Sequence, residues 1–454
     1  MKISKKFSEL GLNPELVRAT EELGFTQATP VQTQAIPALL EGKDVLACAM
    51  TGSGKTAAFL LPILQRLSSL PRGRTRVLII SPTRELAAQT QQHLTELAKH
   101  TRITGAAVYG GVGMKPQEDA FRRGVDIIAA TPGRLLDHMQ HSYAKLQDID
   151  VLVLDEADRM LDMGFLPDIK RVLRQLPQRE RQTMLFSATM PGPIAALSRE
   201  LLRDPVRIDV ERKQAPASGV AQALYPVPAK LKVNLLIELL QRDEIGNAIV
   251  FCRTKHRSNR LAEKLDRAGF EVARIHGNRS QSQRTEALAG FKAGRYRVLV
   301  ATDIVARGID VEALEHVVNF DVPNVAEDYI HRVGRTARAD ATGDAYTFVS
   351  PEEEADMKMI ERAVGRTIER RRVEGFDYNA RVEERLEVPI GERIAEIRAR
   401  KADERARAKV NTARRAGTAS GGAPKQGASS GGGQRRRRGG RGGRNGGNST
   451  SSAA

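Results

Sequence analysis

Cysteine, tryptophan and long apolar runs are scarce or missing in this chain of 454 residues. There is no tryptophan, aromatic residues make up 4%, and the only cysteines are Cys48 and Cys252, each inside a short apolar run. Two distant cysteines provide neither a disulfide framework nor a zinc pattern, so we expect buried free thiols in a reducing, cytoplasmic environment. No apolar run approaches the roughly 18 residues of a membrane span, and the start, MKISKKFSEL, lacks the apolar centre of a secretory signal. We therefore expect a cytoplasmic protein with no membrane partner.

The positive charge of the chain is concentrated at its C-terminal end. The formal net charge is +17, and residues 405–454 hold twelve Lys or Arg and no Asp or Glu, which leaves 17 − 12 = +5 for the rest. A strongly basic tail indicates a polyanionic partner, most often nucleic acid. A tail that only improves solubility would have the same composition, so composition alone leaves both interpretations open.

Short apolar runs alternate with amphipathic segments such as 83–100 and 191–202, in two successive blocks. The runs that predict buried strands are 44–49, 76–81, 105–110, 125–130, 151–158 and 183–189, and then 247–252, 271–276, 297–302, 316–320 and 344–350. This alternation is typical of parallel sheets with helices on both faces. The sequence therefore predicts two α/β domains in tandem.

Composition also marks the limits of these domains. The first is expected over residues 1–210, a polar linker with Pro and Gly over 211–219, and the second domain over 220–370. Residues 371–454 are first charged and helix-prone, then low in complexity, ending in GGGQRRRRGGRGGRNGG. Such a sequence cannot bury a core, so we expect a disordered basic tail.

The stretch AMTGSGKT (49–56) follows a predicted strand and precedes a predicted helix. It ends in Gly54-Lys55-Thr56, as a phosphate-binding P-loop does, although Ala49 stands where the general pattern has Gly. The glycines let backbone N–H groups surround phosphate oxygens. We expect Lys55 to contact the outer phosphates and the Thr56 hydroxyl to bind Mg²⁺.

A second signal is the buried strand VLVL (151–154) that runs directly into Asp155-Glu156-Ala157-Asp158. In a P-loop sheet the carboxyl end of a strand faces the nucleotide, where Asp155 would hold Mg²⁺ and Glu156 would orient or deprotonate the attacking water. Asp158, one step further, is expected to link motifs rather than to bind metal. Acids at a helix start are also favoured by the helix dipole, and both explanations can hold for the same residues.

These motifs and their order resemble the DEAD-box RNA helicases. The resemblance covers residues 5–370 and rests on GFTQATPVQ (24–32) with Phe7 upstream, AMTGSGKT, PTREL (82–86), GG (110–111), TPGR (131–134), DEAD (155–158), SAT (187–189), VFCRTK (250–255), QSQR (281–284), ATDIVARGID (301–310) and HRVGRTAR (331–338). The compact core with a short basic extension is similar to the bacterial RhlE type. Two positions depart from the usual motifs, Met50 in place of Gln and Ala337 in place of Gly.

The resemblance implies two RecA-like domains and an ATP site shared between them. Gln32 would pair with the edge of adenine and Phe7 would stack on its face, while Asp310 would lie at the ribose and Gly308 would allow close backbone approach. Arg335 and Arg338 would act as arginine fingers on the γ-phosphate; without the family, HRVGRTAR would be interpreted as a solvated basic helix. The implied ATP-binding set is Phe7, Gln32, Thr51, Gly52, Ser53, Gly54, Lys55, Thr56, Gly308 and Asp310, with Thr56 and Asp155 on Mg²⁺ and Lys55, Asp155, Glu156, Arg335 and Arg338 as catalytic residues.

The resemblance also implies an RNA-binding surface and residues that couple it to ATP. The RNA-binding set is Pro82, Thr83, Arg84, Gly110, Gly111, Thr131, Pro132, Arg134, Thr254, Gln281, Arg284, Thr302 and Asp303. Hydroxyls, Arg side chains and exposed amides suit phosphates and 2′-hydroxyls, so we expect binding without sequence preference. The coupling set is Ser187, Thr189, Asp158 and His331, although a Ser-Ala-Thr turn can equally be a helix cap.

The expected activity is RNA-stimulated ATP hydrolysis, coupled to closure of the two domains and to local, non-processive unwinding of short duplexes. The basic tail would hold RNA loosely. An RNA clamp with slow turnover and a DNA helicase are the alternatives. Ribosome assembly, RNA decay and cold adaptation, each with its own protein partners, are all compatible with this sequence.

Overall fold

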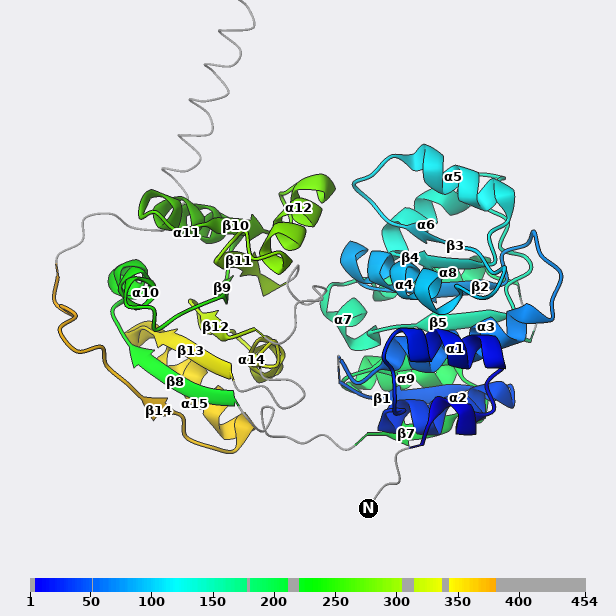
Figure 1. Cartoon of the computed structure of the whole chain (residues 1–454), viewed down its shortest axis with the longest axis horizontal. Helices are drawn as coiled ribbons and strands as arrows, with labels where there is room; N and C mark the ends of the chain where they lie inside the picture. Colours follow the sequence, from blue (N-terminus) through cyan, green and yellow to red (C-terminus); the bar gives the residue numbers. More distant parts are fainter. Residues whose placement is uncertain are drawn as a thin grey trace, which may run out of the picture. The chain divides into compact units, whose positions relative to one another are not determined.

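The structure is a computed structural model that describes residues 5–50, 52–177, 180–210, 220–303, 314–336 and 343–380. Within these ranges the strands form two parallel sheets, both in one compact unit of the chain (Figure 1). This confirms the predicted α/β class with two tandem RecA-like domains, which we call the first lobe (5–210) and the second lobe (220–380). The predicted linker, 211–219, and the chain beyond 380 lie outside the described residues. None of the described helices is long and apolar enough to cross a membrane.

The sheet of the first lobe contains every strand predicted for it and adds β7. Its strands are β1 (Val45–Cys48), β2 (Val77–Ile80), β3 (Gly105–Val108), β4 (Ile127–Ala130), β5 (Val151–Leu154), β6 (Gln182–Ser187) and β7 (Val206–Asp209). They lie in the order β3-β4-β2-β5-β6-β1-β7, and all pairs are parallel.

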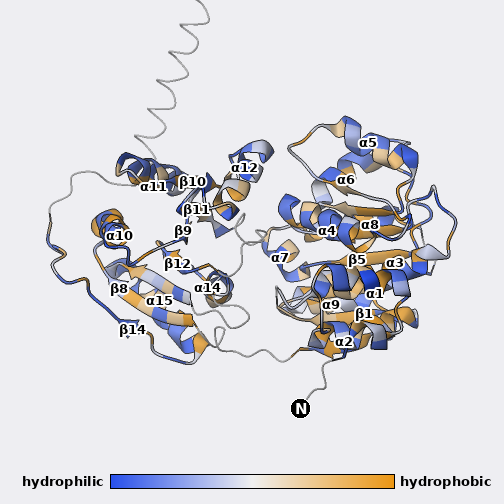
Figure 2. Ribbon diagram, in the orientation of Figure 1, coloured by the Kyte–Doolittle hydropathy of each residue, from blue (hydrophilic) through white to orange (hydrophobic). Residues whose placement is uncertain are grey.

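Helices cover both faces of this sheet. They are η1 (Phe7–Leu10), α1 (Pro14–Glu22), α2 (Pro30–Leu40), α3 (Lys55–Ser68), α4 (Arg84–Leu97), α5 (Met114–Arg123), α6 (Pro132–Met139), α7 (Ala157–Asp162), α8 (Leu166–Gln175) and α9 (Gly192–Leu201). Successive residues of β2 point to opposite faces, as the period of two requires: Val77 and Ile79 pack in one core cluster, Leu78 and Ile80 in the other. The hydrophobic strands therefore lie between helices whose outer faces are hydrophilic (Figure 2).

The second lobe repeats this plan. Its strands are β8 (Val220–Pro226), β9 (Ala248–Cys252), β10 (Val272–Ile275), β11 (Val298–Thr302), β12 (His316–Asn319), β13 (Gly343–Val349) and β14 (Glu369–Arg370). Their order is β10-β11-β9-β12-β13-β8-β14, again with parallel pairing. The helices are η2 (Ala229–Leu231), α10 (Lys232–Gln241), α11 (Lys255–Arg267), α12 (Gln281–Lys292), α14 (Ala326–Val333), η3 (Pro351–Glu353) and α15 (Glu354–Val364).

Packing in the second lobe continues beyond residue 370, where the sequence suggested its end. Val373 is buried in the core, and Phe376 and Tyr378 pack against the same cluster. The backbone N–H of Arg371 donates to Leu224 O of β8 at 2.7 Å. The folded part of this lobe thus extends at least to residue 380.

Sheet order places the predicted motifs of the first lobe next to each other. Strands β5, β6 and β1 are neighbours, with Cys48 beside Ser187 and Leu154 beside Leu185. In a parallel sheet the carboxyl ends of neighbouring strands meet at one edge, where ligands bind. The P-loop after β1, the acidic stretch after β5 and the end of β6 therefore converge on one site.

Candidate functional site

The segment between β1 and α3 forms a turn with two glycines at the position where the sequence predicts a P-loop. Gly52 and Gly54 have φ angles of 77° and 87°, which glycine adopts without steric cost. A Cβ atom on Gly54 would lie 2.4 Å from Nε2 of Gln32. Glycine is therefore required here both for the backbone conformation and for the close approach of Gln32. Thr51 lies outside the described residues.

A cavity of about 510 Å³ opens beside this turn. Of the sequence-predicted residues, its lining contains Phe7, Gln32, Gly52, Gly54, Lys55, Thr56, Asp155, Glu156 and Arg335. Ser53 does not line it; its hydroxyl donates to Met50 O at 2.7 Å. The structure thus brings together residues from GFTQATPVQ with Phe7 upstream (the Q-motif segment), the P-loop, the acidic stretch and HRVGRTAR.

Two charged side chains in this cavity are suited to a phosphate and a cation. Lys55 is 6% exposed and Asp155 is 4% exposed. Within the described residues, neither Lys55 Nζ nor Asp155 Oδ1 has a hydrogen-bond partner. Burial raises the pKa of Asp155 to about 6, against the pull of Lys55. Since buried charged groups are normally paired, these atoms fit a phosphate and a Mg²⁺ ion. Thr56 lines the same cavity.

Gln32 connects the Q-motif segment to the P-loop. Its Oε1 accepts from the backbone N–H of Thr29 at 2.8 Å, and its Nε2 donates to Gly54 O at 3.0 Å. Its predicted contact with adenine stays a prediction, and it would have to use the second N–H and the second lone pair of the same amide.

The aromatic residues of this segment differ in exposure. Phe7 is 3% exposed, whereas Phe25 is 40% exposed, lines the cavity, and has its ring centroid 6.4 Å from that of Phe7. The sequence analysis named Phe7 as the residue that stacks on adenine and did not name Phe25. Phe25 could have been considered, because it is the one aromatic residue inside GFTQATPVQ.

Glu156 is held by a partner that the sequence interpretation did not single out. Arg159 Nη1 lies 2.6 Å from Glu156 Oε2, and both side chains are almost fully buried. Glu156 has φ 53°, a left-handed conformation that costs energy for a residue other than glycine. The carboxylate that is predicted to act on water is therefore fixed by the helical turn that follows it.

Asp158 links α7 to the SAT turn, as the sequence interpretation expected. Its Oδ2 accepts from the backbone N–H groups of Ala188 and Thr189, at 3.1 and 2.7 Å, and from Thr189 Oγ1 at 3.0 Å. In return, the N–H of Asp158 donates to Ser187 Oγ, which donates to Thr189 O. The predicted coupling residues of the first lobe thus form one hydrogen-bonded unit.

The predicted RNA-binding residues of the first lobe lie at helix starts and on one glycine turn. Thr83 caps α4 by accepting from Leu86 N–H, and Thr131 is at the N-cap position of α6, followed by Pro132. Pro82 and Thr83 are buried, and Gly111 is exposed with φ 85°. A Cβ atom on Gly111 would lie 2.1 Å from Arg84 Nη1, so the glycine makes room for that side chain.

Two residues outside the motifs hold this glycine turn in place. Gln117 Nε2 donates to Tyr109 O and Gly113 O, on either side of Gly110 and Gly111. Gln117 Oε1 faces the buried His138 of α6 at 3.3 Å. Arg134 Nη1 also donates to Val112 O at 3.1 Å. Side-chain hydrogen bonds therefore connect the GG turn to the helix that begins with TPGR. The roles of Gln117 and His138 could not be predicted from the sequence.

In the second lobe, Thr254 and α12 occupy similar positions. Thr254 caps α11 by accepting from Arg257 N–H. Gln281 and Arg284, the first and fourth residues of α12, both contact the Glu85 carboxylate of PTREL, Arg284 at 2.7 Å. Asp303, next to Thr302 at the end of β11, pairs with Arg332 at 2.6 and 2.8 Å. His331 is half-buried on α14.

Arg338, Gly308 and Asp310, together with Ala337, lie outside the described residues. Their predicted contacts with ATP stay predictions, as does the fit of Arg335 to the γ-phosphate, although Arg335 is 5% exposed and lines the cavity.

Comparison with known proteins decides the family. Residues 29–197 match the DEAD/DEAH box helicase family, and residues 231–340 match the helicase conserved C-terminal domain. The DEAD-box ATP-dependent RNA helicase CshA of Bacillus cereus is 41% identical over 380 residues, which are 84% of this chain and 72% of CshA. The chain belongs to the DEAD-box ATP-dependent RNA helicases. The CshA of Bacillus subtilis is also 41% identical, over 364 residues.

Solved DEAD-box structures share the fold of this helicase. Saccharomyces cerevisiae Dbp5, bound to RNA and ADP BeF3, has a TM-score of 0.73 and 33% identity, covering 81% of this chain and 95% of its own. Mss116 bound to single-stranded RNA and UDP-BeF has a TM-score of 0.74 and 28% identity, with 82% and 80% covered. The expected family is confirmed, and its members use ATP. The similarity to the RhlE type stays a prediction.

Proposed function

We propose that this DEAD-box helicase hydrolyses ATP in the cavity beside the P-loop, that RNA stimulates the reaction, and that the two lobes close on both ligands. The observation that carries this proposal is a pair of buried atoms, Lys55 Nζ and Asp155 Oδ1, which have no partner among the described residues and lie in a cavity also lined by Arg335. A phosphate and a cation would satisfy both atoms at once.

Each residue of the ATP site has a role that follows from its position. Lys55 neutralises the outer phosphates, and the backbone N–H groups of the glycine turn bind their oxygens. Asp155 and the Thr56 hydroxyl would hold Mg²⁺, which when bound supplies positive charge to the phosphate oxygens. Glu156, fixed by Arg159, orients the attacking water and accepts its proton.

Arg335 completes this site from the second lobe. A guanidinium that reaches the γ-phosphate stabilises the charge of the transition state, an effect of roughly 10³–10⁵ in rate for arginine fingers. Because Arg335 and Lys55 belong to different lobes, hydrolysis depends on how the lobes meet. Any ligand that favours their closure therefore favours hydrolysis.

RNA is the ligand that we propose for this role. The solved relatives Dbp5 and Mss116 are bound to RNA. The predicted RNA-binding residues of this chain include threonines at helix starts, arginines and an exposed glycine turn. Such groups bind phosphates and 2′-hydroxyls rather than base edges. ATP and RNA that both favour closure raise each other's affinity by the same factor.

The consequence for RNA is local strand separation. Closure around one bound strand distorts a short duplex, and hydrolysis with phosphate loss reopens the lobes, so no translocation is required.

We place the protein in the cytoplasm, acting in ribosome assembly, RNA decay or cold adaptation. The hydrogen bonds of Asp158 with Ser187 and Thr189 connect α7, which follows Asp155 and Glu156, to the end of β6. We propose that this unit transmits closure.

The test compares nucleic acids as stimulators and as substrates. ATP hydrolysis is measured with single-stranded RNA and with DNA of the same sequence, and strand separation with RNA duplexes of about one and about three helical turns. Lys55→Met is the inactive reference, and Lys43→Met, an exposed lysine of the same lobe paired with Glu41, is the matched control.

We expect RNA but not DNA to stimulate hydrolysis, and only the short duplex to separate. Stimulation by DNA would favour the DNA helicase alternative. Stimulated hydrolysis without any strand separation would favour the RNA clamp. Separation of the long duplex by single enzyme molecules would contradict the non-processive proposal.

A further inference from the structure

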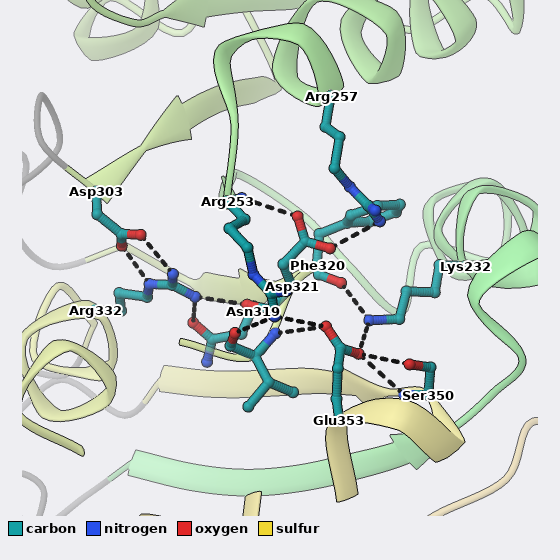
Figure 3. A network of polar contacts seen from close by, with 11 residues as sticks. Lys232, Arg253, Arg257, Asp303, Asn319, Phe320, Asp321, Arg332, Ser350 and Glu353 are labelled. Atoms are coloured by element: carbon teal, nitrogen blue, oxygen red, sulfur yellow. Dashed lines mark hydrogen bonds and ion pairs between the residues drawn. The ribbon is translucent and has the colours of Figure 1, made fainter. Parts of the chain in front are cut away.

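A buried aspartate of the second lobe lies outside every motif quoted above and contacts two of them. Asp321 is the second residue after β12, between ATDIVARGID, which ends at 310, and HRVGRTAR, which begins at 331. It is 2% exposed. Figure 3 shows it within a network of charged side chains that come from several elements. Because a buried carboxylate needs well-placed partners, the identity of those partners indicates its role.

The carboxylate of Asp321 holds the turn that follows β9. Its Oδ2 accepts from the backbone N–H of Arg253 at 2.8 Å, and its Oδ1 pairs with Arg257 Nη2 of α11 at 2.8 Å (Figure 3). The next residue, Thr254, is the predicted RNA-binding residue of this turn and caps α11. Asp321 therefore fixes the residue before Thr254 and the helix after it.

The main chain of Asp321 holds a different motif. Its carbonyl oxygen accepts from Arg332 Nη1 of HRVGRTAR at 2.7 Å. The same Nη1 donates to Asn319 Oδ1 at 3.1 Å, and Nε and Nη2 of Arg332 pair with the Asp303 carboxylate at 2.6 and 2.8 Å. Arg332 is 3% exposed. The ends of β11 and β12 thus enclose its guanidinium and fix the end of α14.

Arg332 in turn determines where Arg335 begins. The two residues are three apart, and the N–H of Arg335 donates to Arg332 O at 3.1 Å. Arg335 is 5% exposed and lines the cavity beside the P-loop. A single residue, Asp321, therefore contacts both the turn that carries Thr254 and the arginine that holds the turn of Arg335.

A purely structural role is the alternative, and Asp44 of the first lobe shows what such a role looks like. Asp44 is 6% exposed and accepts from the backbone N–H groups of Thr183 and Arg203, at 2.7 and 2.8 Å. It precedes β1 and so lies at the edge of the sheet opposite to the P-loop. Asp44 joins segments that carry no predicted ligand residue, whereas Asp321 joins two turns that each carry one.

We propose that Asp321 is a positioning residue that couples RNA binding to the placement of Arg335. RNA bound at Thr254 fixes the turn after β9, and Asp321 passes this constraint to Arg332 through its own short backbone. Rigid, hydrogen-bonded segments of this kind carry coupling between sites. The inference rests on the proposed function and adds to it a coupling residue of the second lobe. Asp321 itself touches neither RNA nor ATP.

The experiment measures this coupling in the full chain. The coupling factor is the affinity for a labelled, unstructured single-stranded RNA in the presence of ADP BeF3, divided by the affinity without nucleotide. This ratio removes any change that a variant causes in RNA affinity alone. Asp321→Asn removes the charge at nearly constant volume, and Asp44→Asn is the matched control. Arg335→Gln and the double variant Asp321→Asn/Arg335→Gln test whether the effect runs through Arg335.

We expect Asp321→Asn to lower the coupling factor roughly tenfold, about the value of one charge-assisted hydrogen bond. The factor by which RNA raises the affinity for ADP BeF3 should fall equally, because coupling is reciprocal. Asp44→Asn should keep the wild-type factor even if it melts at as low a temperature as Asp321→Asn. The double variant should not fall below Arg335→Gln, because residues that act through one contact are not additive.

A second variant keeps the test decisive if Asp321→Asn does not fold. Asn319→Ser removes the other acceptor of Arg332 Nη1 at the end of β12 and leaves Asp321 in place. It loosens the same guanidinium, so it should also lower the coupling factor. An unchanged factor in this variant would contradict the role given to Arg332.

An unchanged coupling factor in Asp321→Asn would overturn the inference, as would effects that add in the double variant. An equal fall in Asp44→Asn would also overturn it, because lost stability would then explain the change. If RNA and ADP BeF3 showed no coupling in the wild type, the proposed function would fail first. The wild-type measurement therefore separates the two failures.

Discussion

At the scale of single residues, His276 shows how this fold controls a titrating group. It follows β10 and is 1% exposed. Its Nδ1 accepts from Asn278 N–H, and its Nε2 faces Asn259 Oδ1 at 2.9 Å. This arrangement fits the neutral ring with its proton on Nε2. Burial lowers the pKa of His276 to about 4, and Arg279 and Arg274 add to the shift.

The shift predicts how stability depends on pH. The folded pKa is about 4 and that of an unfolded histidine about 6.5, so between these values the unfolded chain binds a proton that the folded chain does not. Lowering the pH through this window should therefore destabilise the protein. We expect His276→Gln to lose less thermal stability than the wild type between pH 7 and pH 5.

The control is His141→Gln, which removes an exposed histidine of the first lobe. Its pH profile should follow that of the wild type. An identical pH dependence of the unfolding midpoint in His276→Gln and the wild type would show that the imidazole does not carry this effect.

The sequence allowed the site residues to be named, but it did not allow the contacts between them to be predicted equally well. Lys55 and Asp155 could be placed, because a glycine turn and a strand end leave little choice of position. The partners of Gln32 and Glu156 could not, because they depend on which side chains the tertiary fold brings within 3 Å. Glu156 precedes α7 with a left-handed backbone, so helical spacing did not indicate its contact with Arg159 three residues later.

At the scale of elements, the segment after β14 is the part of the second lobe whose packing could not be predicted from composition. It is rich in charge, RRRVEGFDYNA over residues 370–380, yet Val373 is 6% exposed, and its N–H donates to the hydroxyl of Tyr378 at 2.9 Å. A few apolar side chains between charged ones are sufficient to close the core beside β8.

This packing predicts the effect of shortening the chain. Compared with a chain that ends at 380, one that ends at 370 loses the buried Val373 and the packing of Phe376 and Tyr378. That loss corresponds to about 2 kcal/mol, and therefore to a melting temperature lower by roughly 4–8 °C for a lobe of this size. Calorimetry of the two chains checks it; equal melting of the 370 and 380 chains would refute the packing argument.

Strands with unbroken apolar runs could be predicted, whereas the half-polar strand β7 could not. Strands such as β2 and β5 are buried on both faces, and their unbroken apolar runs show it. Strand β7, at the edge of its sheet, alternates exposed Arg207 and Asp209 with buried Ile208. A four-residue strand that is half polar resembles a loop in sequence, and only its pairing with β1 makes it a strand.

At the scale of the whole molecule, the account depends on two lobes that each hold part of one reaction. The first lobe supplies Lys55, Asp155 and Glu156, and the second supplies Arg335, which lines the same cavity. The tandem domains could be predicted from the alternation of strands and helices. That Arg335 reaches the cavity could only be expected from the family, because no local pattern states which residues of two domains face each other.

The most direct measurement is the rate of ATP hydrolysis with and without single-stranded RNA, in the wild type and in Arg335→Gln. We predict that RNA raises the wild-type rate, and that Arg335→Gln lowers the stimulated rate by roughly 10³-fold or more while ATP binding is retained. Arg295→Gln, an exposed arginine of the second lobe, should behave as the wild type. An RNA-independent rate, or a stimulated rate that survives in Arg335→Gln, would contradict the account.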